Sequence, residues 1–186
     1  LLLHNKAPHR VWAPDTCDLD LYSEKIYPIP STFYDDYAGR KAADKQKMSI
    51  IKDMDLVYDL KMADKENEIH SDPELEKWGR ASYLRMTPSQ RAQWDAHYEP
   101  VIRKFKEMKL SGKALAEWKY QRYMHDYLRV IHSIDRNVGR VIAYLRANGL
   151  LDNTMIVYTS DQGFYMGEHG WFDKRFMYEE SFRTPL

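Results

Sequence analysis

The sequence predicts an α/β fold in which a crossover helix packs against a sheet. Apolar residues recur at spacings of three and four between residues 113 and 148, which is typical of a long amphipathic helix. Asn148 and Gly149 then form a helix-stop signal, and the short apolar run at residues 155–158 is typical of a buried strand. A helix, a short turn and a buried strand in this order indicate an α/β sheet with crossover helices.

The composition is that of an ordinary globular protein. Of the 186 residues, 44% are hydrophobic and 30% are charged, which is enough for one substantial core. Lys and Arg together number 28, as do Asp and Glu, so no net charge favours nucleic acid as a partner. The single cysteine, Cys17, excludes an internal disulfide, and no apolar run approaches the ~20 residues of a membrane span.

The first residues resemble the end of a strand and the loop that follows it. Three leucines are followed by a loop with two prolines and two histidines. Within this loop, His9 is either a surface histidine or a proton donor or anion binder that faces the same cleft as Asp161. The chain begins without methionine and holds too few strands for a parallel sheet, so we expect a piece of a larger domain.

Residues 41–112 are predicted to be a charged helical insertion. Residues 41–60 have a loose helical pattern, and Pro73 and Thr87 mark the starts of two further helices. Because the block is so charged, we expect it to pack over an edge or to line a cleft rather than to form the core. Just before it, Asp35 and Asp36 are adjacent carboxylates, for which a solvated turn is favoured over a metal site.

The chemistry gathers after the predicted strand. Asp161 and Gln162 lie at its carboxyl end, where α/β sheets bind ligands, and their oxygens suit calcium or magnesium better than zinc. The alternative is a strand-end aspartate that caps the following turn. Lys174 follows a glycine-bounded loop, and with the metal it would clamp a phosphoryl or sulfuryl group. Glu168 and His169 in that loop either join the site or only tie the loop together.

Several segments resemble type I sulfatases. Residues 160–174, Ser-Asp-Gln-Gly-Phe-Tyr-Met-Gly-Glu-His-Gly-Trp-Phe-Asp-Lys, resemble the second metal-binding segment of that family, and residues 173–186 resemble the run ending in Arg-Thr-Pro-Leu that follows it. Lys-Ala-Pro-His at residues 6–9 resembles the loop that carries an active-site histidine. The helix and turn at residues 134–154 resemble those that precede the metal strand. The matched segments occur in the order and spacing of the family.

This resemblance implies that residues 1–186 are a partial catalytic domain of the alkaline-phosphatase-like α/β fold. Such a domain has a mainly parallel sheet flanked by helices, here with the insertion at about 41–112 and a helix, strand and metal/sulfate-binding loop at 113–186. It implies a hydrolase of sulfate esters that uses calcium, with magnesium less favoured. Asp161 and Gln162 would ligate the ion, Lys174 would hold the sulfate oxygens, and His9 would contact the sulfate or its bridging oxygen.

The resemblance also implies a sulfated small molecule or glycan as substrate, with most similarity to bacterial carbohydrate sulfatases and the N-acetylglucosamine-6-sulfatase group. The compartment would be periplasmic or extracellular. Trp78, Trp94 and Trp118 in and beside the insertion would either stack on sugar rings or pack in the protein, and for Trp118 packing is favoured.

Two parts of the family pattern are missing from these residues. The family nucleophile is a formylglycine made in a Cys/Ser-x-(Pro/Ala)-x-Arg motif, and an Asp-Asp pair before that motif supplies two metal ligands. Cys17 stands in Cys-Asp-Leu-Asp-Leu, and Asp35 and Asp36 lie after His9 rather than before the motif. We therefore expect these residues alone to bind metal poorly and to be inactive.

Two alternatives stay open. One is a phosphate mono- or diester hydrolase of the same superfamily, and the other is a non-catalytic binding relative with the same fold. Gln162 in place of a histidine favours the hard-cation sulfatase over the phosphate hydrolase.

Overall fold

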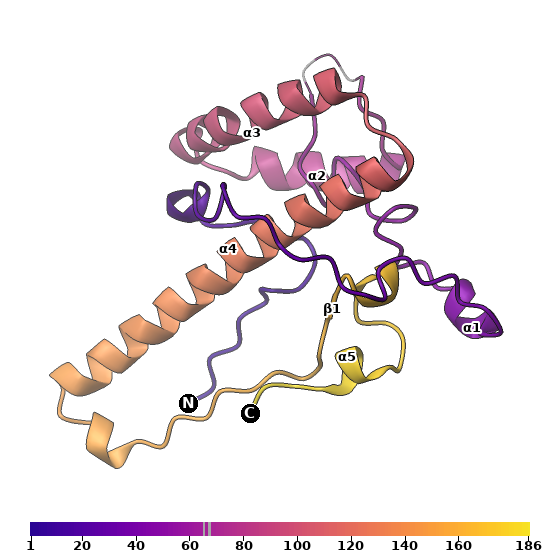
Figure 1. Cartoon of the computed structure of the whole chain (residues 1–186). Helices are drawn as coiled ribbons and strands as arrows, with labels where there is room; N and C mark the ends of the chain where they lie inside the picture. Colours follow the sequence, from indigo (N-terminus) through magenta and orange to yellow (C-terminus); the bar gives the residue numbers. More distant parts are fainter. Residues whose placement is uncertain (65, 67) are drawn as a thin grey trace.

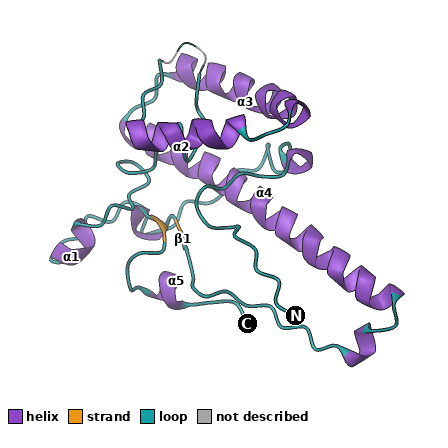
Figure 2. Cartoon of the chain, turned by 180° about the vertical axis from the view of Figure 1, so that it is seen from behind, coloured by secondary structure: helices purple, strands orange, loops and turns teal. Residues whose placement is uncertain are grey.

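The structure is a computed structural model that describes residues 1–64, 66 and 68–186. In chain order its elements are η1 (Thr16–Asp18), α1 (Lys41–Asp44), α2 (Pro73–Leu84), α3 (Pro88–Met108), α4 (Gly112–Ala147), η2 (Leu151–Asn153), β1 (Tyr165–Met166), η3 (Glu168–Gly170), β2 (Phe172–Asp173) and α5 (Glu179–Phe182). Helix α4 runs diagonally through the molecule, with α2 and α3 above its N-terminal half and β1 and α5 below it (Figures 1 and 2).

Helices α2 and α3 begin where their capping residues predict. The Asp72 carboxylate accepts hydrogen bonds from the backbone N–H groups of Glu74 and Leu75, at 2.9 and 3.2 Å. At the start of α3, Thr87 and Gln90 form a reciprocal capping box. Both helices carry proline in their first turn, where the missing N–H has no intrahelical partner to lose.

Helix α4 matches the predicted helix almost residue for residue. It ends at Ala147, with Asn148 as its C-cap and Gly149 next at φ +65°. Its inner face supplies the centre of the main core, which also holds residues from every earlier part of the chain. The buried members of this core are Trp12, Leu19, Phe33, Ile50, Met54, Leu60, Met62, Tyr98, Ile102, Ala116, Tyr120, Tyr123, Val130, Ile134 and Phe172.

The structure differs from two of the expectations for residues 41–112. Helical structure in the 41–60 stretch is limited to α1, and turns follow it. The block also contributes to the core, because Met48, Ile50 and Leu60 are buried. Ile50 N–H donates to the Gly170 carbonyl at 2.8 Å, and Phe172 N–H donates to the Met48 carbonyl at 2.9 Å. The block is therefore built into the same unit as the 160–174 loop.

The sheet of the described residues is a two-stranded antiparallel hairpin, in which Tyr165 pairs with Asp173 and Met166 with Phe172. The predicted buried strand at residues 155–158 is extended but unpaired, and the side chains of Met155 and Val157 are 90% and 66% exposed. A strand is stabilised by hydrogen bonds to neighbours, and none of the described residues provides a neighbour for this one. The three N-terminal leucines are likewise exposed and outside any strand.

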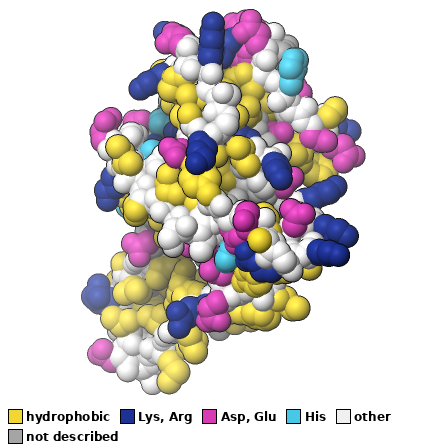
Figure 3. Space-filling view, turned by 45° about the vertical axis from the view of Figure 1, so that its right-hand side comes forward, with side chains coloured by type: hydrophobic (Ala, Val, Ile, Leu, Met, Phe, Trp, Pro, Cys, Tyr) yellow, Lys and Arg dark blue, Asp and Glu magenta, His cyan; other side chains and the backbone are white. Residues whose placement is uncertain are grey.

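Exposed apolar side chains consequently gather in the lower part of Figure 3, at the height of the C-terminal end of α4 and the 155–158 segment. In the described part of the chain, no helix combines the length and the apolar character needed to cross a membrane.

Candidate active site

The Ser160–Gly163 turn is held tightly against α5 and the segment that follows it. Gly163 N–H donates to the Ser181 carbonyl at 2.8 Å, and the Thr159 hydroxyl donates to the Pro185 carbonyl at 3.0 Å. A Cβ atom on Gly163 would lie 2.0 Å from the Glu180 carbonyl oxygen, so only glycine fits at this position. The turn and the C-terminal segment therefore take one fixed arrangement.

Asp161 and Gln162, the predicted metal ligands, lie at the surface of this turn. Asp161 is exposed, and within the described residues its carboxylate receives only a weak hydrogen bond, from Ser160 Oγ at 3.5 Å. A carboxylate without a cation or a strong donor beside it has ligand positions to offer, and its hard oxygen suits calcium or magnesium. The residues fit such an ion, but two side chains fill only part of its coordination sphere. Their role as ligands stays a prediction.

The loop between β1 and β2 is tied internally and to residues 32–37. Glu168 Oε2 accepts a hydrogen bond from Met166 N–H at 2.6 Å, and His169 Nδ1 lies 2.7 Å from Asp35 Oδ2. The hydroxyl of Tyr37 donates to the His169 carbonyl. These contacts favour the interpretation that Glu168 and His169 tie the loop together.

Asp35 supplies the negative charge in these contacts. It is therefore not part of a solvated Asp-Asp turn, which was the interpretation favoured from the sequence. Its carboxylate accepts from the Arg40 guanidinium, from the Tyr37 N–H at 2.9 Å, and pairs with His169. The Arg40 hydrogen bond holds the pKa of Asp35 well below its usual value, against the opposing effect of partial burial and with help from His169. The second carboxylate, Asp36, instead caps the backbone N–H of Ala38 at 2.8 Å.

Trp171 anchors the same loop through its ring. The side chain is buried and stacks on Tyr37, with ring centroids 5.3 Å apart at 17°, and on Tyr178, at 5.7 Å and 28°. Burial raises the pKa of Tyr37 to about 12, with a further contribution from Asp35, so its hydroxyl keeps the proton that it donates to the loop. The glycine-bounded loop is thus rigidly seated.

Lys174, the predicted sulfate-binding cation, follows directly on β2. Its ammonium lies 3.2 Å from Asp173 Oδ1 and 5.7 Å from the centre of the Phe164 ring, and its side chain is 15% exposed. Phe164 comes two residues after Gln162, so the lysine lies near the residue that directly follows the 160–163 turn.

His9 lies in the other half of the candidate site. Its side chain is exposed, and Nδ1 lies 2.7 Å from the Arg10 carbonyl oxygen, which leaves Nε2 for a ligand. Trp12, three residues on, is fully buried and meets the rings of Phe164 and Phe172 edge-on, each at 6.1 Å. The structure therefore brings the His9 loop, the 160–163 turn and the Lys174 hairpin together around Phe164.

Sequence reasoning missed two charged residues of this region. Arg10 places its guanidinium between the Tyr58 and Phe172 rings, 5.3 and 5.0 Å from their centres, and pairs with Asp59. The position of Arg10 next to His9 in the sequence was a signal that could have identified it as part of this region. Asp59 is separated from Arg10 by 49 residues and carried no such signal.

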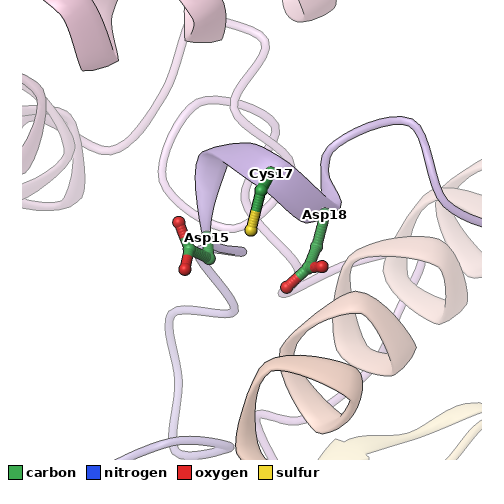
Figure 4. A group of neighbouring side chains, drawn as sticks. All are labelled: Asp15, Cys17 and Asp18. Atoms are coloured by element: carbon green, nitrogen blue, oxygen red, sulfur yellow. The ribbon is translucent and has the colours of Figure 1, made fainter. Parts of the chain in front are cut away.

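A separate acidic group lies at η1. Ligand atoms of Asp15, Cys17 and Asp18 lie within 4.8 Å of one another (Figure 4), an arrangement that resembles a metal site. However, Arg136 donates to both oxygens of Asp18, at 2.6 and 2.7 Å, and to Asp15 at 2.7 Å. The guanidinium already pairs with both carboxylates, so a metal would have to displace it.

The tryptophans of the insertion differ in their surroundings. Trp118 packs on Phe105, with ring centroids 4.3 Å apart, and contacts the core, as favoured from the sequence. Trp78 is 52% exposed. Trp94 lines a cavity of about 820 Å³ between α2 and α3, whose wall also includes Val11 of the His9 loop.

The chain is similar to known proteins over its whole length. The Sulfatase family model matches residues 1–186. N-acetylglucosamine-6-O-sulfatase from Bacteroides thetaiotaomicron is 47% identical over 187 residues, which is 100% of this chain and 33% of that protein. The multifunctional alkaline phosphatase superfamily protein PehA from Trinickia caryophylli is 39% identical over 93 residues, 48% of this chain and 18% of its own.

A solved structure is also similar. It is that of BT4656 in complex with its substrate D-glucosamine-2-N,6-O-disulfate, with a TM-score of 0.87 and 46% sequence identity. The likeness covers 98% of this chain and 36% of that one. The present chain thus spans about a third of the length of N-acetylglucosamine-6-O-sulfatase and of the BT4656 chain.

Proposed function

Because this chain belongs to the sulfatase family, whose model matches residues 1–186, we propose that the protein is a sulfuric ester hydrolase acting on a sulfated sugar. The observation that carries the proposal is that this match takes in both His9 and the 160–174 segment. The supporting geometry is the meeting of the two segments around Phe164.

We infer that the substrate is a glucosamine derivative with a sulfate ester on O6. Two comparisons support this choice, one with a protein named as an N-acetylglucosamine-6-O-sulfatase and one with a structure solved with D-glucosamine-2-N,6-O-disulfate as its substrate. Both are more than 45% identical to this chain along nearly all of it.

Lys174 and His9 have different roles toward the sulfate group. Lys174 is a fixed ammonium whose charge stabilises the sulfate oxygens as negative charge develops on them. His9, protonated at Nε2, donates its proton to the bridging oxygen, so that the sugar leaves as a neutral alcohol. The partial burial of Lys174 strengthens its interaction with an anion, because water screens it less.

Asp161 and Gln162 would hold the calcium ion together with ligands from outside these residues. The bound ion would add positive charge beside the sulfate oxygens. The nucleophile of the family, a formylglycine, is expected from a motif that residues 1–186 do not contain.

The test is sulfate release by the full-length protein. We expect it to hydrolyse N-acetylglucosamine-6-sulfate, and to act at least ~10-fold more slowly on the 4-sulfate and 6-sulfate of N-acetylgalactosamine, since a misplaced hydroxyl leaves polar groups unpaired in the site. Absence of sulfate release from every sugar sulfate would overturn the proposal.

A phosphate ester hydrolase is the second candidate, because PehA belongs to the alkaline phosphatase superfamily and matches about half of the chain. Aryl sulfate and aryl phosphate assayed side by side separate the two. Preferred turnover of the phosphate would favour this second candidate.

A further inference from the structure

A buried ion pair joins the two halves of the candidate site. Arg10 Nε and Nη2 donate to the two carboxylate oxygens of Asp59, each at 2.6 Å. Paired hydrogen bonds of this kind fix both the distance and the orientation of the guanidinium. Asp59 is fully buried, and the Arg10 side chain is only 14% exposed.

The Arg10 guanidinium links the His9 loop to the residues just before Lys174. Arg10 follows His9 directly, and its guanidinium lies 5.0 Å from the centre of the Phe172 ring on β2. The charge of Asp173, the residue before Lys174, also acts on Arg10. The Asp59 pair therefore holds the His9 loop against β2, the strand that directly precedes Lys174.

The turn that carries Asp59 is itself fixed. Asp59 Oδ2 accepts a further hydrogen bond from Asp55 N–H at 2.8 Å. Two residues on, the buried Lys61 ammonium donates to the Trp12 carbonyl at 2.5 Å and to Asp126 Oδ2 on α4 at 3.0 Å. Residues 55–61 thus hold the His9 loop through Arg10 and Trp12, and they are themselves anchored to helix α4.

We propose that Asp59 is a positioning residue for the reaction, which fixes His9 relative to Lys174 by holding Arg10 against Phe172. The inference rests on the proposed function, in which His9 and Lys174 act on one sulfate group. It gives the 41–112 block a specific part in catalysis, although none of its residues is required to touch the substrate.

The kinetic test uses the full-length enzyme with Asp59→Asn, which keeps the size of the side chain and removes its charge. We expect kcat to fall about 10- to 100-fold with KM changed much less, because small displacements of catalytic groups have effects of that order. Glu76→Gln is the matched control. It breaks an exposed pair with Arg80 on α2, and kcat should stay at the wild-type value. An unchanged kcat in Asp59→Asn would overturn the proposal.

A double-mutant cycle separates positioning from general destabilisation. If Asp59 acts through His9, then Asp59→Asn should reduce kcat by less than about 3-fold in a His9→Ala background, since the group it positions is already gone. The same fold reduction in both backgrounds would show a merely structural role and overturn the proposal. Arg10→Lys keeps the charge but loses the paired geometry, so it replaces Asp59→Asn if that variant does not fold.

Amide hydrogen exchange tests, independently of activity, whether Asp59 holds the His9 loop against β2. Asp59→Asn should speed amide exchange both in residues 6–13 and in residues 172–176, while the middle of α4 stays as slow as in the wild type. An unchanged exchange rate in either segment would show that Asp59 does not hold the two segments together and would overturn the proposal. If the wild-type enzyme releases no sulfate, the proposed function fails on its own, and the exchange result still tests whether Asp59 joins the two segments.

Discussion

Gly163→Ala tests whether the metal-ligand turn depends on close contact with the C-terminal segment. The added methyl group would meet the Glu180 carbonyl oxygen at 2.0 Å and the Arg183 carbonyl oxygen at 2.5 Å. Both atoms belong to the backbone, so the contact cannot be relieved by a side-chain rotation, and residues 180–183 have to move by roughly 1 Å or more to reach ordinary van der Waals distance.

The cost has two parts. Overpacking of a closed contact typically costs about 1–3 kcal/mol, and the shift also breaks the hydrogen bond from Gly163 N–H to Ser181, worth about 1 kcal/mol. We therefore expect the free energy of unfolding to fall by about 2–4 kcal/mol. Because Asp161 and Gln162 directly precede this glycine, calcium affinity should fall as well.

Urea denaturation of the purified protein measures the change, with Gly79→Ala as the control. Gly79 lies inside α2, where the nearest atom to an added Cβ is at an ordinary 3.7 Å. This control should leave stability unchanged or raise it by up to about 1 kcal/mol, since alanine favours the helix. Equal stability of the two variants would refute the close-contact argument.

Four further predictions follow from the site and the caps. Lys174→Ala in the full-length enzyme should lower kcat by ~100-fold or more, as loss of one transition-state charge contact usually does, and near-normal turnover would show that the lysine acts elsewhere. Removal of calcium with a chelator should abolish sulfate release, and added calcium should restore it; activity that survives exhaustive chelation contradicts the metal assignment. Because the pKa of Asp35 is lower in the folded than in the unfolded protein, its contribution to stability should be complete above pH ~4 and be lost as the pH falls through the folded pKa, which acid titration of wild type against Asp35→Asn measures. Thr87→Ala should cost about 1 kcal/mol by removing the capping box, whereas Thr87→Ser should cost much less, and equal losses in thermal unfolding would argue against the cap.

Local signals predicted helices α2, α3 and α4 well. The start signals at Pro73 and Thr87 and the stop at Asn148 lie within a few residues of the helix ends that they mark, so sequence alone locates them. The family match and the structural likeness also confirm the predicted α/β sulfatase class. That class came from ordered motifs rather than from the strand at 155–158, which is unpaired in the described residues.

Contacts between distant residues explain the failures. The charged block at residues 41–112 was expected outside the core, but its turns place Met48 and Leu60 inward at positions that follow no regular period. The pair of Arg10 with Asp59 and that of His169 with Asp35 span 49 and 134 residues. Nothing in the neighbourhood of either aspartate distinguishes it from a solvated one, because its partner is set by the fold.

The stacking of Trp171 between Tyr37 and Tyr178 gives the loop between β1 and β2 a fluorescence signal of its own. Trp171 is enclosed between two phenol rings, and the His169 imidazole lies 5.5 Å away, close enough for a protonated ring to quench indole emission. Subtracting the spectrum of Trp171→Phe removes the light from the other tryptophans. The difference follows the position of the loop in real time, with no substrate and no label. Stopped-flow fluorescence can therefore time movements of the loop while turnover is measured separately.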